Sequence, residues 1–381
     1  MRNILLITGS RGEYGYIRPI VREIEKAPDL DYSLVVTNLH LLTEFGRSVE
    51  EIEKDGLEIA ERLFMALDGY TPASMSKSLG IFLMGITDVL SRMKPDIVLL
   101  AGDRGEQLMT AIAAGHMNIP IAHIQAGELS GNIDGMSRHA ITRFAHIHFA
   151  SSEDAAQRLR RMGEQDSRIH LTGAPQLDEL HRGDYAPLDE ITGLFRLDPK
   201  VPFVLFVQHP VTEEYDSTAR QVEETLEAIC EIGVPTVAIF PNNDAGSAEL
   251  RRVLERYRRP FIKIERNLSR RIYLGLLHSA SAMVGNSSSG LIEAPCFRLP
   301  AVNVGTRQRG RERGSNVIDV EAEKSAIRRA LERALSADFR TKLDADCRNP
   351  YLGDGNVSQR IVEILRTVLI DEDLLKKQIA Y

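Results

Sequence analysis

Residues 3–15 read NILLITGSRGEYG, an apolar run that passes directly into a glycine-rich turn. The hydrophobicity of the run is continuous and does not alternate, which is typical of a parallel strand buried on both faces. The turn has neither the GK[ST] of a Walker A loop nor the spacing of GxGxxG. Its glycines and Arg11, placed before a predicted helix, could bind an anion through backbone N–H groups. A turn with only a structural role fits the residues equally well.

The same pattern of strand, turn and helix recurs along the chain. Amphipathic stretches at 18–26, 154–162, 219–232 and 248–257 predict helices between the apolar runs. The predicted strands cover residues 3–8, 32–37, 96–101, 119–124, 146–150, 168–172, 203–208, 235–240, 261–264, 282–285 and 301–304. Two halves of repeating βα units predict an α/β fold class with two doubly wound, Rossmann-like domains.

A charged, turn-rich stretch at 181–200 separates the two halves, and we place the domain boundary near residue 182. This division gives an N-terminal domain over 1–182 and a second domain over 183–355. A long surface loop inside one domain would also fit the stretch. After a GDG turn, apolar residues at helical spacing predict a C-terminal helix within 356–381, which could pack on either domain.

The composition narrows the class of protein. The chain has 381 residues, 43% hydrophobic and 27% charged, with a formal net charge of −7. These values exclude an intrinsically disordered chain, and the acidic total argues against a general nucleic-acid binder. Three scattered cysteines form no zinc-type cluster, and the apolar runs are too short for a signal peptide or a membrane span. We therefore expect a cytoplasmic protein that uses no metal, nucleic acid or membrane.

Polar clusters follow several predicted strands, at the position where ligands bind to open α/β sheets. Asp103 and Arg104 follow the third predicted strand, while Glu128, Asp134 and Arg138 lie in and after the glycine-rich stretch that follows the fourth. Solvated loop carboxylates, with Asp134 as a helix N-cap, would explain each residue alone. Their concentration at adjacent strand ends favours a functional site.

A second polar series follows the strands of the other half. Its Gly/Ser loop, GNSSSG at 285–290, suits a diphosphate through backbone amides and hydroxyls. Glu293 could accept hydrogen bonds from a ribose diol, and Arg307 could neutralise phosphate. The later arginines Arg309, Arg311 and Arg313 are expected on a solvated face. The candidate residues of this series are His209, Asn242, Gly285, Ser287, Ser288, Glu293 and Arg307.

These motifs together resemble the hydrolysing UDP-N-acetylglucosamine 2-epimerases of sialic-acid and related nonulosonic-acid pathways. The resemblance spans nearly the whole chain. It rests on TGSRGEYG (8–15), GDR (102–104), GELSGNIDGMSRHAIT (127–142), QHPVT (208–212), FPNNDAGS (240–247), GNSSSGLIE (285–293), GTRQRGRERG (305–314) and GDGN (353–356).

The resemblance implies a GT-B-type fold that binds a UDP-sugar in the interdomain cleft, with the final helix crossing back onto the N-terminal domain. It implies conversion of UDP-N-acetylglucosamine to UDP and N-acetylmannosamine through an acetamidoglycal, with no cofactor, by a homodimer or homotetramer. By resemblance, Asp103 and Asp134 fall on positions proposed for acid/base work. Arg138 and His209 match residues near the sugar and the diphosphate. Arg11, Arg104, Asn242, Arg307 and the 287–288 loop would contact the substrate.

One position departs from the family pattern. Many members have a glutamate where this chain has Gln125, and an amide cannot act as a base. Glu128 could take over that role, or Asp103 and Asp134 could suffice. Relatives without this glutamate act on a UDP-2,4-diacetamido-2,4,6-trideoxy sugar, which is the second candidate substrate. The motifs also leave open a non-hydrolysing epimerase, a GT-B glycosyltransferase or a UDP-sugar sensor.

Overall fold

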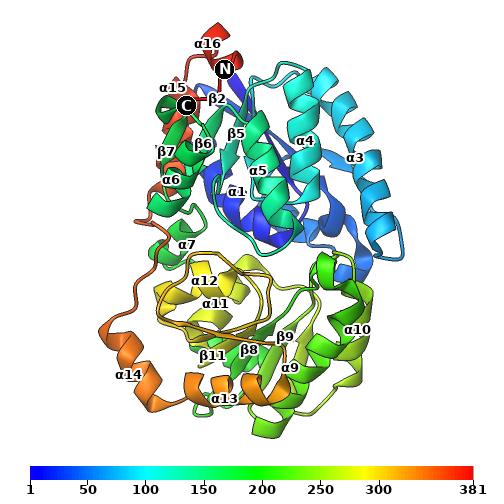
Figure 1. Cartoon of the computed structure of the whole chain (residues 1–381), viewed down its shortest axis with the longest axis vertical. Helices are drawn as coiled ribbons and strands as arrows, with labels where there is room; N and C mark the ends of the chain where they lie inside the picture. The colour runs from blue at the N-terminus through cyan, green and yellow to red at the C-terminus, as the bar shows by residue number, and fades with distance from the viewer. Residues whose placement is uncertain (381) are drawn as a thin grey trace.

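Two parallel β-sheets, each covered by helices, make up the computed structural model, which describes residues 1–380 (Figure 1). The first sheet has the order β3-β2-β1-β4-β5-β6-β7 and the second the order β10-β9-β8-β11-β12-β13, and all neighbouring strands are parallel. Both orders are those of a doubly wound fold. The chain is therefore an α/β protein of two Rossmann-like units, as its alternating pattern predicts.

The eleven strands predicted from continuous apolar runs are all present. The strands are β1 (Arg2–Thr8), β2 (Leu30–Thr37), β3 (Ile59–Leu63), β4 (Ile97–Ala101), β5 (Ile121–Ile124), β6 (Ile147–Ala150), β7 (Ile169–Leu171), β8 (Val204–Val207), β9 (Thr236–Ile239), β10 (Ile262–Glu265), β11 (Ala282–Gly285), β12 (Ala301–Val304) and β13 (Val317–Val320). Strands β3 and β13 were not predicted from the sequence. Each lies at the edge of its sheet and is only partly buried, so it lacks the continuous apolar run of an inner strand.

Sixteen α-helices connect and follow the strands in the described residues. They are α1 (Arg11–Ile24), α2 (Val49–Lys54), α3 (Pro72–Met93), α4 (Gly105–His116), α5 (Ile133–Phe144), α6 (Glu153–Arg161), α7 (Leu177–Arg182), α8 (Leu188–Phe195), α9 (Thr218–Ile232), α10 (Ser247–Arg256), α11 (Arg270–Ser279), α12 (Ser289–Ile292), α13 (Lys324–Ala334), α14 (Ala337–Ala345), α15 (Val357–Thr367) and α16 (Glu372–Leu375). The four helices predicted by range all occur.

Helix α1 begins earlier than the sequence suggested. Ser10 is its N-cap, and the Ser10 hydroxyl accepts the backbone N–H of Glu13 at 3.4 Å. The glycine-rich turn after β1 is therefore only two residues long, and GEYG forms the first turns of the helix. A Cβ at Gly15 would lie 3.3 Å from the Arg270 guanidinium carbon, so the glycine leaves room for this side chain. Arg11, the first residue of the helix, thus stands at its amino end.

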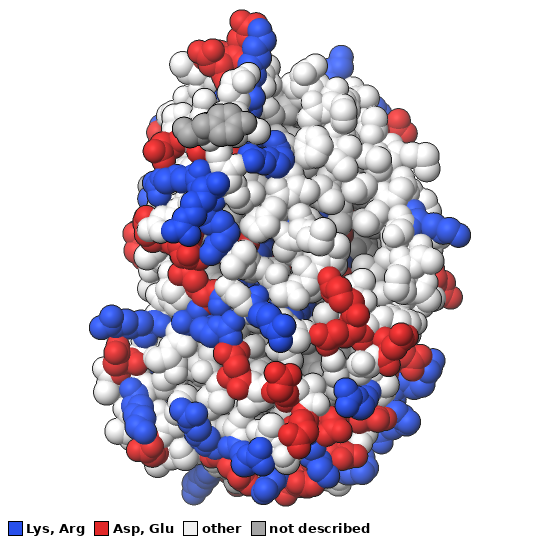
Figure 2. Space-filling model, in the orientation of Figure 1, with Lys and Arg blue, Asp and Glu red and all other residues white. Residues whose placement is uncertain are grey.

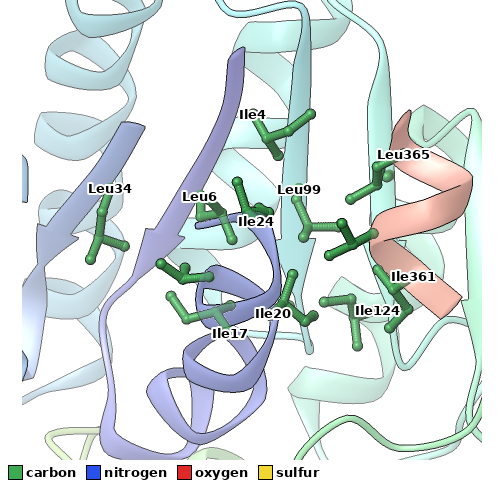
Figure 3. Close-up of a cluster of buried hydrophobic side chains, with 14 of the residues drawn as sticks. Ile4, Leu6, Ile17, Ile20, Ile24, Leu34, Leu99, Ile124, Ile361 and Leu365 are labelled. Carbon is green, nitrogen blue, oxygen red and sulfur yellow. The ribbon is translucent and has the colours of Figure 1, made fainter. Parts of the chain in front are cut away.

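Helix α15 packs against the first sheet, although it follows the second sheet in the chain. Its Val357, Ile361 and Leu365 belong to the same buried cluster as Ile17 and Ile20 of α1 (Figure 3). All five side chains are fully excluded from solvent. The apolar spacing that predicted a C-terminal helix therefore corresponds to a face buried on the N-terminal unit.

The segment between the two sheets is helical, where the sequence suggested an irregular linker. Helix α7 ends at Gly183, which has a φ of +75°, and α8 follows after a short turn. Leu177 of α7 and Phe195 of α8 share a buried cluster with Leu205 of β8. A domain boundary near residue 182 remains a prediction.

Helix α3 is long and apolar enough to cross a membrane by length and composition alone, the one such helix among residues 1–380. No stretch of this kind was expected from the sequence. One face of α3, with Phe82, Ile86 and Leu90, packs into the core beside Leu5 of β1 and Val98 of β4. That face accounts for part of the apolar character of the helix.

Charged side chains are unevenly distributed over the face in Figure 2. They gather over the second unit and along one edge of the first, whereas the area over α3, α4 and α5 shows few of them (Figures 1 and 2). Met84 of α3 and Met136 of α5 are 67% and 71% exposed. This area is consequently the least charged part of the visible surface.

Candidate functional site

A cavity lies between the two units at the carboxyl ends of both sheets. Loops after β1, β4 and β5 line it from one side, and loops after β8, β9, β11 and β12 line it from the other. This is the position where doubly wound sheets bind ligands. The sequence-predicted residues that line the cavity are Arg11, Asp103, Arg104, Asp134, Arg138, His209, Asn242, Ser287, Ser288, Glu293 and Arg307.

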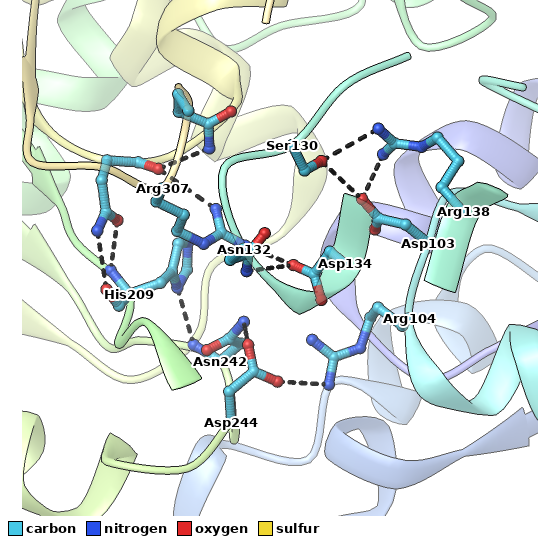
Figure 4. Close-up of polar contacts among 12 residues, drawn as sticks. Asp103, Arg104, Ser130, Asn132, Asp134, Arg138, His209, Asn242, Asp244 and Arg307 are labelled. Atoms are coloured by element: carbon cyan, nitrogen blue, oxygen red, sulfur yellow. Dashed lines mark hydrogen bonds and ion pairs between the residues drawn. The ribbon is translucent and has the colours of Figure 1, made fainter. Parts of the chain in front are cut away.

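Asp103 is held by a buried arginine. Arg138 is 1% exposed and forms an ion pair with Asp103 through Nη2 (Figure 4). The Ser130 hydroxyl donates to Asp103 Oδ2 at 3.2 Å and accepts from Arg138 Nη1 at 3.1 Å. Burial alone would raise the pKa of Asp103, but the charges of Arg138, Arg311 and Arg307 outweigh it and hold that pKa below its usual value. Asp103 is therefore an oriented, ionised carboxylate.

Asp134 has the opposite electrostatic environment. It lies in the first turn of α5, where Asn132 Nδ2 donates to its Oδ2 at 2.9 Å and Arg307 Nη2 is 3.6 Å away. Burial and the negative charges of Asp103 and Asp244 raise its pKa to about 7. Asp103 is thus ionised at neutral pH, whereas Asp134 exchanges a proton near it. Such a divergence is typical of acid/base pairs in enzymes. Glu51 and Glu13 also line the cavity, and burial raises their pKa values to about 7 and about 8.

Arg11 brings a positive charge without a carboxylate partner of its own. Its guanidinium donates from Nη1 to the carbonyl of Arg266 and from Nη2 to that of Phe240, both at 2.8 Å. Burial lowers its pKa to about 10, which leaves the group charged at neutral pH. Since its partners are carbonyls of the second unit, Arg11 crosses the cleft with charge available for an anion.

His209 is a neutral donor aimed by the backbone. Its ring Nδ1 accepts the backbone N–H of Asn242 at 3.1 Å. The backbone N–H of His209 donates to Asn286 Oδ1 at 2.7 Å, and its backbone carbonyl accepts from Asn286 Nδ2 at 2.9 Å (Figure 4). Burial and the charges of Arg307, Arg11 and Arg104 lower its pKa well below the usual value. Because Nδ1 accepts, the ring proton resides on Nε2, which leaves Nε2–H as a donor.

The serine loop and Arg307 bring hydrogen-bond donors to the cavity from the second unit. Ser287 and Ser288 lie between β11 and the four-residue helix α12. Arg307 Nη1 donates to the carbonyl of Asn286 at 3.3 Å, which ties it to the same loop. Two hydroxyls and a guanidinium are therefore grouped on the second unit, opposite the carboxylates of the first.

Arg104 lines the cavity with two of its three guanidinium nitrogens already paired. Its Nη2 forms an ion pair with Asp244 Oδ1 at 3.0 Å, and its Nε donates to Glu106 Oε1 at 3.0 Å (Figure 4). These carboxylates raise its pKa well above the usual value in spite of its burial. Arg104 therefore forms a salt bridge across the cleft to Asp244 of the second unit.

Glu128 and Gly285, both predicted at the site from the sequence, do not line the cavity. Glu128 is 3% exposed and forms an ion pair with Arg311 of the second unit. Gly285 has a φ of +129°, and a Cβ there would lie 2.0 Å from the Val207 carbonyl oxygen, so it permits the close packing of β11 on β8. Gln125 is also buried, 1% exposed, and does not line the cavity.

Several lining residues were missed from the sequence. Arg311 was expected on a solvated face, but it is 7% exposed and lines the cavity, whereas Arg309 is exposed as predicted. Arg270, at the start of α11, forms ion pairs with Glu293 and Glu179 at 2.5 and 2.9 Å. Glu293 therefore reaches the cavity already paired. No motif quoted from the sequence includes Arg270. Its role emerges only from the structure, where its guanidinium fills the space over Gly15.

No group of three or more His, Cys, Asp or Glu residues in the described part of the chain is arranged to hold a metal ion. The carboxylates that line the cavity instead pair with arginines or raise one another's pKa. The arrangement provides proton transfer on one side and stabilisation of an anion on the other.

Several known proteins are similar to this chain over most of its length. The model of the UDP-N-acetylglucosamine 2-epimerase family matches residues 22–366. A UDP-N,N'-diacetylbacillosamine 2-epimerase (hydrolyzing) of Legionella pneumophila is 38% identical over 382 residues and covers 100% of both chains. A UDP-N-acetylglucosamine 2-epimerase of Neisseria meningitidis is 32% identical over 91% of this chain and 90% of its own.

Solved structures agree on the fold. The UDP-GlcNAc 2-epimerase of Methanocaldococcus jannaschii, in complex with UDP-GlcNAc and UDP, matches with a TM-score of 0.80 at 21% identity and covers 96% of this chain and 99% of its own. That of Neisseria meningitidis, bound to UDP-GlcNAc, gives 0.79 at 20% identity over 95% and 99%. The two-unit architecture is thus GT-B-type. With the family model matched over most of its length, the chain belongs to the UDP-N-acetylglucosamine 2-epimerase family.

Proposed function

We propose that this protein is a hydrolysing 2-epimerase of a UDP-2-acetamido sugar. The observation that carries the proposal is the pair Asp103 and Asp134, whose pKa values diverge across one cavity. Arg307 and the serine loop of the second unit, together with Arg11, which reaches across from the first, suit a diphosphate. A carboxylate pair on the sugar side and donors on the diphosphate side match an elimination that releases UDP.

The proposed reaction has two steps. In the first, a carboxylate takes the proton from C2 of the sugar, the C1–O bond breaks, and UDP leaves with the electron pair. The product is a glycal with a double bond between C1 and C2. In the second, the oxygen of water adds to C1 and a proton adds to C2 from the opposite face. The net change consumes one water and yields UDP and the free 2-epimer.

The charge states support distinct roles for the two carboxylates. Asp103 is ionised at neutral pH, and we propose it as the base that takes the C2 proton. Asp134, with a pKa of about 7, holds a proton for part of the time and is proposed as the donor that returns one to C2. Each such role contributes roughly 10²–10⁴-fold to the rate.

Departure of UDP requires stabilisation of a growing negative charge. Arg11, with only carbonyl partners, and Arg307, tied to the serine loop, supply positive charge at the proposed diphosphate site. The Nε2–H of His209 and the hydroxyls of Ser287 and Ser288 add neutral donors. Glu128 is proposed to position Arg311 and not to transfer a proton, since it lies outside the cavity.

The sugar can be narrowed by the relatives. UDP-N-acetylglucosamine is the substrate expected from the resemblance, and the 32% identical relative from Neisseria meningitidis carries that name. The 38% identical relative, matched over the full length of both chains, is instead named for UDP-N,N'-diacetylbacillosamine. We favour this 2,4-diacetamido-2,4,6-trideoxy sugar and keep UDP-N-acetylglucosamine as the second candidate. In either case, supply of a nonulosonic acid pathway is proposed.

Product identification tests the proposal. Each UDP-sugar is incubated with the protein, and ¹H and ³¹P NMR identify the products. The proposal predicts UDP and a free 2-epimer in equal amounts. An intact UDP-sugar epimer would instead indicate a non-hydrolysing epimerase, and release of UDP only after addition of an acceptor would indicate a glycosyltransferase.

A homodimer or homotetramer in the cytoplasm remains the expectation from the family resemblance. Sedimentation velocity at several protein concentrations tests the assembly. A single species at the mass of the 381-residue chain would exclude a homo-oligomer.

A further inference from the structure

A second chamber of about 310 Å³ adjoins the candidate catalytic cavity. Arg104 and Asp134 line both spaces, so the two spaces meet at these residues. A single water needs only about 10–15 Å³ by a comparable measure, so the chamber has the size of a ligand group and is not a packing defect. Its apolar lining comes from Met65, Ala66, Leu67, Tyr70, Pro72, Met75, Leu79 and Ile133.

The chamber is built by the loop between β3 and α3 and by the first turn of α3, and each of the two contacts the second unit. The Ala245 N–H donates to Met75 Sδ at 2.8 Å, and the Gly246 N–H donates to the Tyr70 carbonyl at 3.1 Å. The guanidinium of Arg251 also lies 5.4 Å from the centre of the Tyr70 ring. The loop therefore closes the chamber across the cleft.

The apolar lining reaches the residue next to Arg104. A Cβ on Gly105, the residue after Arg104, would lie 2.6 Å from Leu79 Cδ2, so Leu79 covers the first turn of α4. Met65 is 5% exposed and lies in the same chamber. A ligand group entering from the catalytic cavity would thus pass Asp134 and meet thioether and leucine side chains.

Polar groups line the remainder, namely amides and hydroxyls together with the charged side chains of Arg104, Glu106, Asp134 and Asp244. Asn243 Nδ2 donates to Asn38 Oδ1 at 2.5 Å, and Asn38 Nδ2 donates to Glu106 Oε1 at 3.0 Å. Ser137 and Thr212 add hydroxyls. An apolar space edged by amides and by these charged side chains suits a small group that carries both methyl and amide functions.

The order of residues along the two spaces orients a sugar nucleotide. Ser287 and Ser288 line only the catalytic cavity, Asp134 lines both spaces, and Met75 and Leu79 line only the chamber. In a pyranose, C1 and C4 stand at opposite ends of the ring. With the diphosphate of C1 on the serine loop and C2 at the carboxylates, the C4–C6 end points toward the chamber.

We propose that this chamber is a specificity site for the C4 and C6 substituents of the sugar, and that it selects a 4-acetamido-6-deoxy sugar over one with free hydroxyls. The inference rests on the proposed function and adds the residues that distinguish one sugar from another. Met65, Met75 and Leu79 would contact the C6 methyl and the acetyl methyl, and Asn38 and Asn243 lie near enough to the chamber to meet the amide. Hydroxyls at C4 and C6 would lose water against apolar side chains without full compensation.

The test compares kcat/KM for UDP-2,4-diacetamido-2,4,6-trideoxyglucose and UDP-N-acetylglucosamine in the full-length protein. The inference predicts a preference of at least about 10-fold for the diacetamido sugar, the lower range for discrimination by one apolar contact. Met75→Gln and Leu79→Gln should reduce this preference several-fold. Met84→Gln, on the exposed side of the same helix, is the matched control and should leave it unchanged.

Ala66→Leu provides an independent variant in the loop, because it narrows the chamber and should lower turnover of the diacetamido sugar more than that of UDP-N-acetylglucosamine. Affinity for UDP alone should change little in every variant, which verifies folding. Preference for UDP-N-acetylglucosamine by the wild type, or equal effects of Met75→Gln and Ala66→Leu on both sugars, would overturn the specificity role of the chamber. Neither result would contradict the proposed epimerase activity. Turnover of neither sugar would instead refute the proposed function.

Discussion

The guanidinium of Arg138, on α5, forms an ion pair with the carboxylate of Asp103, which follows β4. The pair fixes a charged carboxylate at the cavity, while Asp134, one turn earlier on α5 than Arg138, has a raised pKa. One short helix thus supplies both the partner of one carboxylate and the other carboxylate itself. A substitution of Arg138 should therefore change the pKa of Asp103 directly and, through the charge of Asp103, the pKa of Asp134.

Asp103→Asn should lower kcat by at least about 10²-fold, because an amide cannot take the C2 proton. Affinity for UDP should stay within a few-fold of the wild-type value, since the proposed diphosphate contacts are Arg11, Arg307 and the serine loop and do not include Asp103. Steady-state kinetics and calorimetry measure the two quantities. Asp338→Asn, at an exposed position of α14, serves as the control. Near-normal turnover of Asp103→Asn would remove Asp103 from the catalytic residues.

Arg138→Met should move the acid limb of the kcat/KM profile to higher pH, by about one unit or more. The substitution removes the nearest charge that counters the burial of Asp103, so the pKa of Asp103 rises. Arg138→Lys, which keeps the charge, should restore part of the wild-type profile. A profile that only decreases in height, with both limbs in place, would indicate that Arg138 does not set the charge state of Asp103.

Asp134 should give the profile a basic limb. Its pKa is about 7 in the folded protein, so the protonated form is lost as the pH rises through that value. Activity that needs a proton on Asp134 therefore decreases above about pH 7. In Asp134→Asn turnover should fall by about 10²-fold or more, and the limb near pH 7 should disappear from the residual activity. Persistence of the same limb would assign it to another group.

The same shift has a consequence for stability. The folded-state pKa of Asp134 lies above the unfolded value, so the folded state binds a proton more tightly than the unfolded state. Stability from this group consequently declines as the pH rises from about 4 to 7, and the ionised carboxylate is destabilising above that range. Asp134→Asn should raise the free energy of unfolding at pH 8 by about 1 kcal/mol or more, and by less at pH 5. Denaturant titrations at both values measure the difference, and an equal effect at pH 5 and 8 would contradict it.

Arg11→Met should weaken UDP binding by roughly 10–100-fold, the range for loss of a charged hydrogen-bonding group. Binding of uridine, which lacks phosphate, should change much less if Arg11 contacts the diphosphate. Calorimetry with both ligands separates the two effects. Arg309→Met, an exposed arginine of the GTRQRGRERG motif, is the matched control. A similar loss for uridine and UDP would indicate that Arg11 only holds the two units together.

Much of the fold is predictable because inner parallel strands are buried on both faces and therefore have continuous apolar runs. Edge strands β3 and β13 are not, since their exposed positions break the run. At the site, strand-end position identifies Asp103 and Asp134. It cannot tell that Arg311 turns inward while Arg309 does not, because that depends on a partner 183 residues away, Glu128. Gly285 was predicted to contact the substrate, but the structure explains the glycine by the close packing of β11 on β8.

The chamber beside Arg104 illustrates a second limit. Met65, Met75 and Leu79 carry no motif, and none of them was predicted from the sequence to have a functional role. They become significant only because Met75, in the first turn of α3, contacts Ala245, so that α3 and the loop before it enclose a space next to Asp134. Contacts between segments this far apart in the chain leave no local pattern in either segment.

Turnover in deuterium oxide distinguishes the proposed elimination from simple hydrolysis of the UDP-sugar. Each UDP-sugar is turned over in D₂O, and mass spectrometry and ¹H NMR follow the label in the sugar. Elimination and readdition predict release of UDP together with a free 2-epimer that carries one deuterium at C2, because the proton removed by Asp103 is replaced from solvent. Hydrolysis to an unlabelled sugar of unchanged configuration, or an epimer still attached to UDP, would contradict this mechanism.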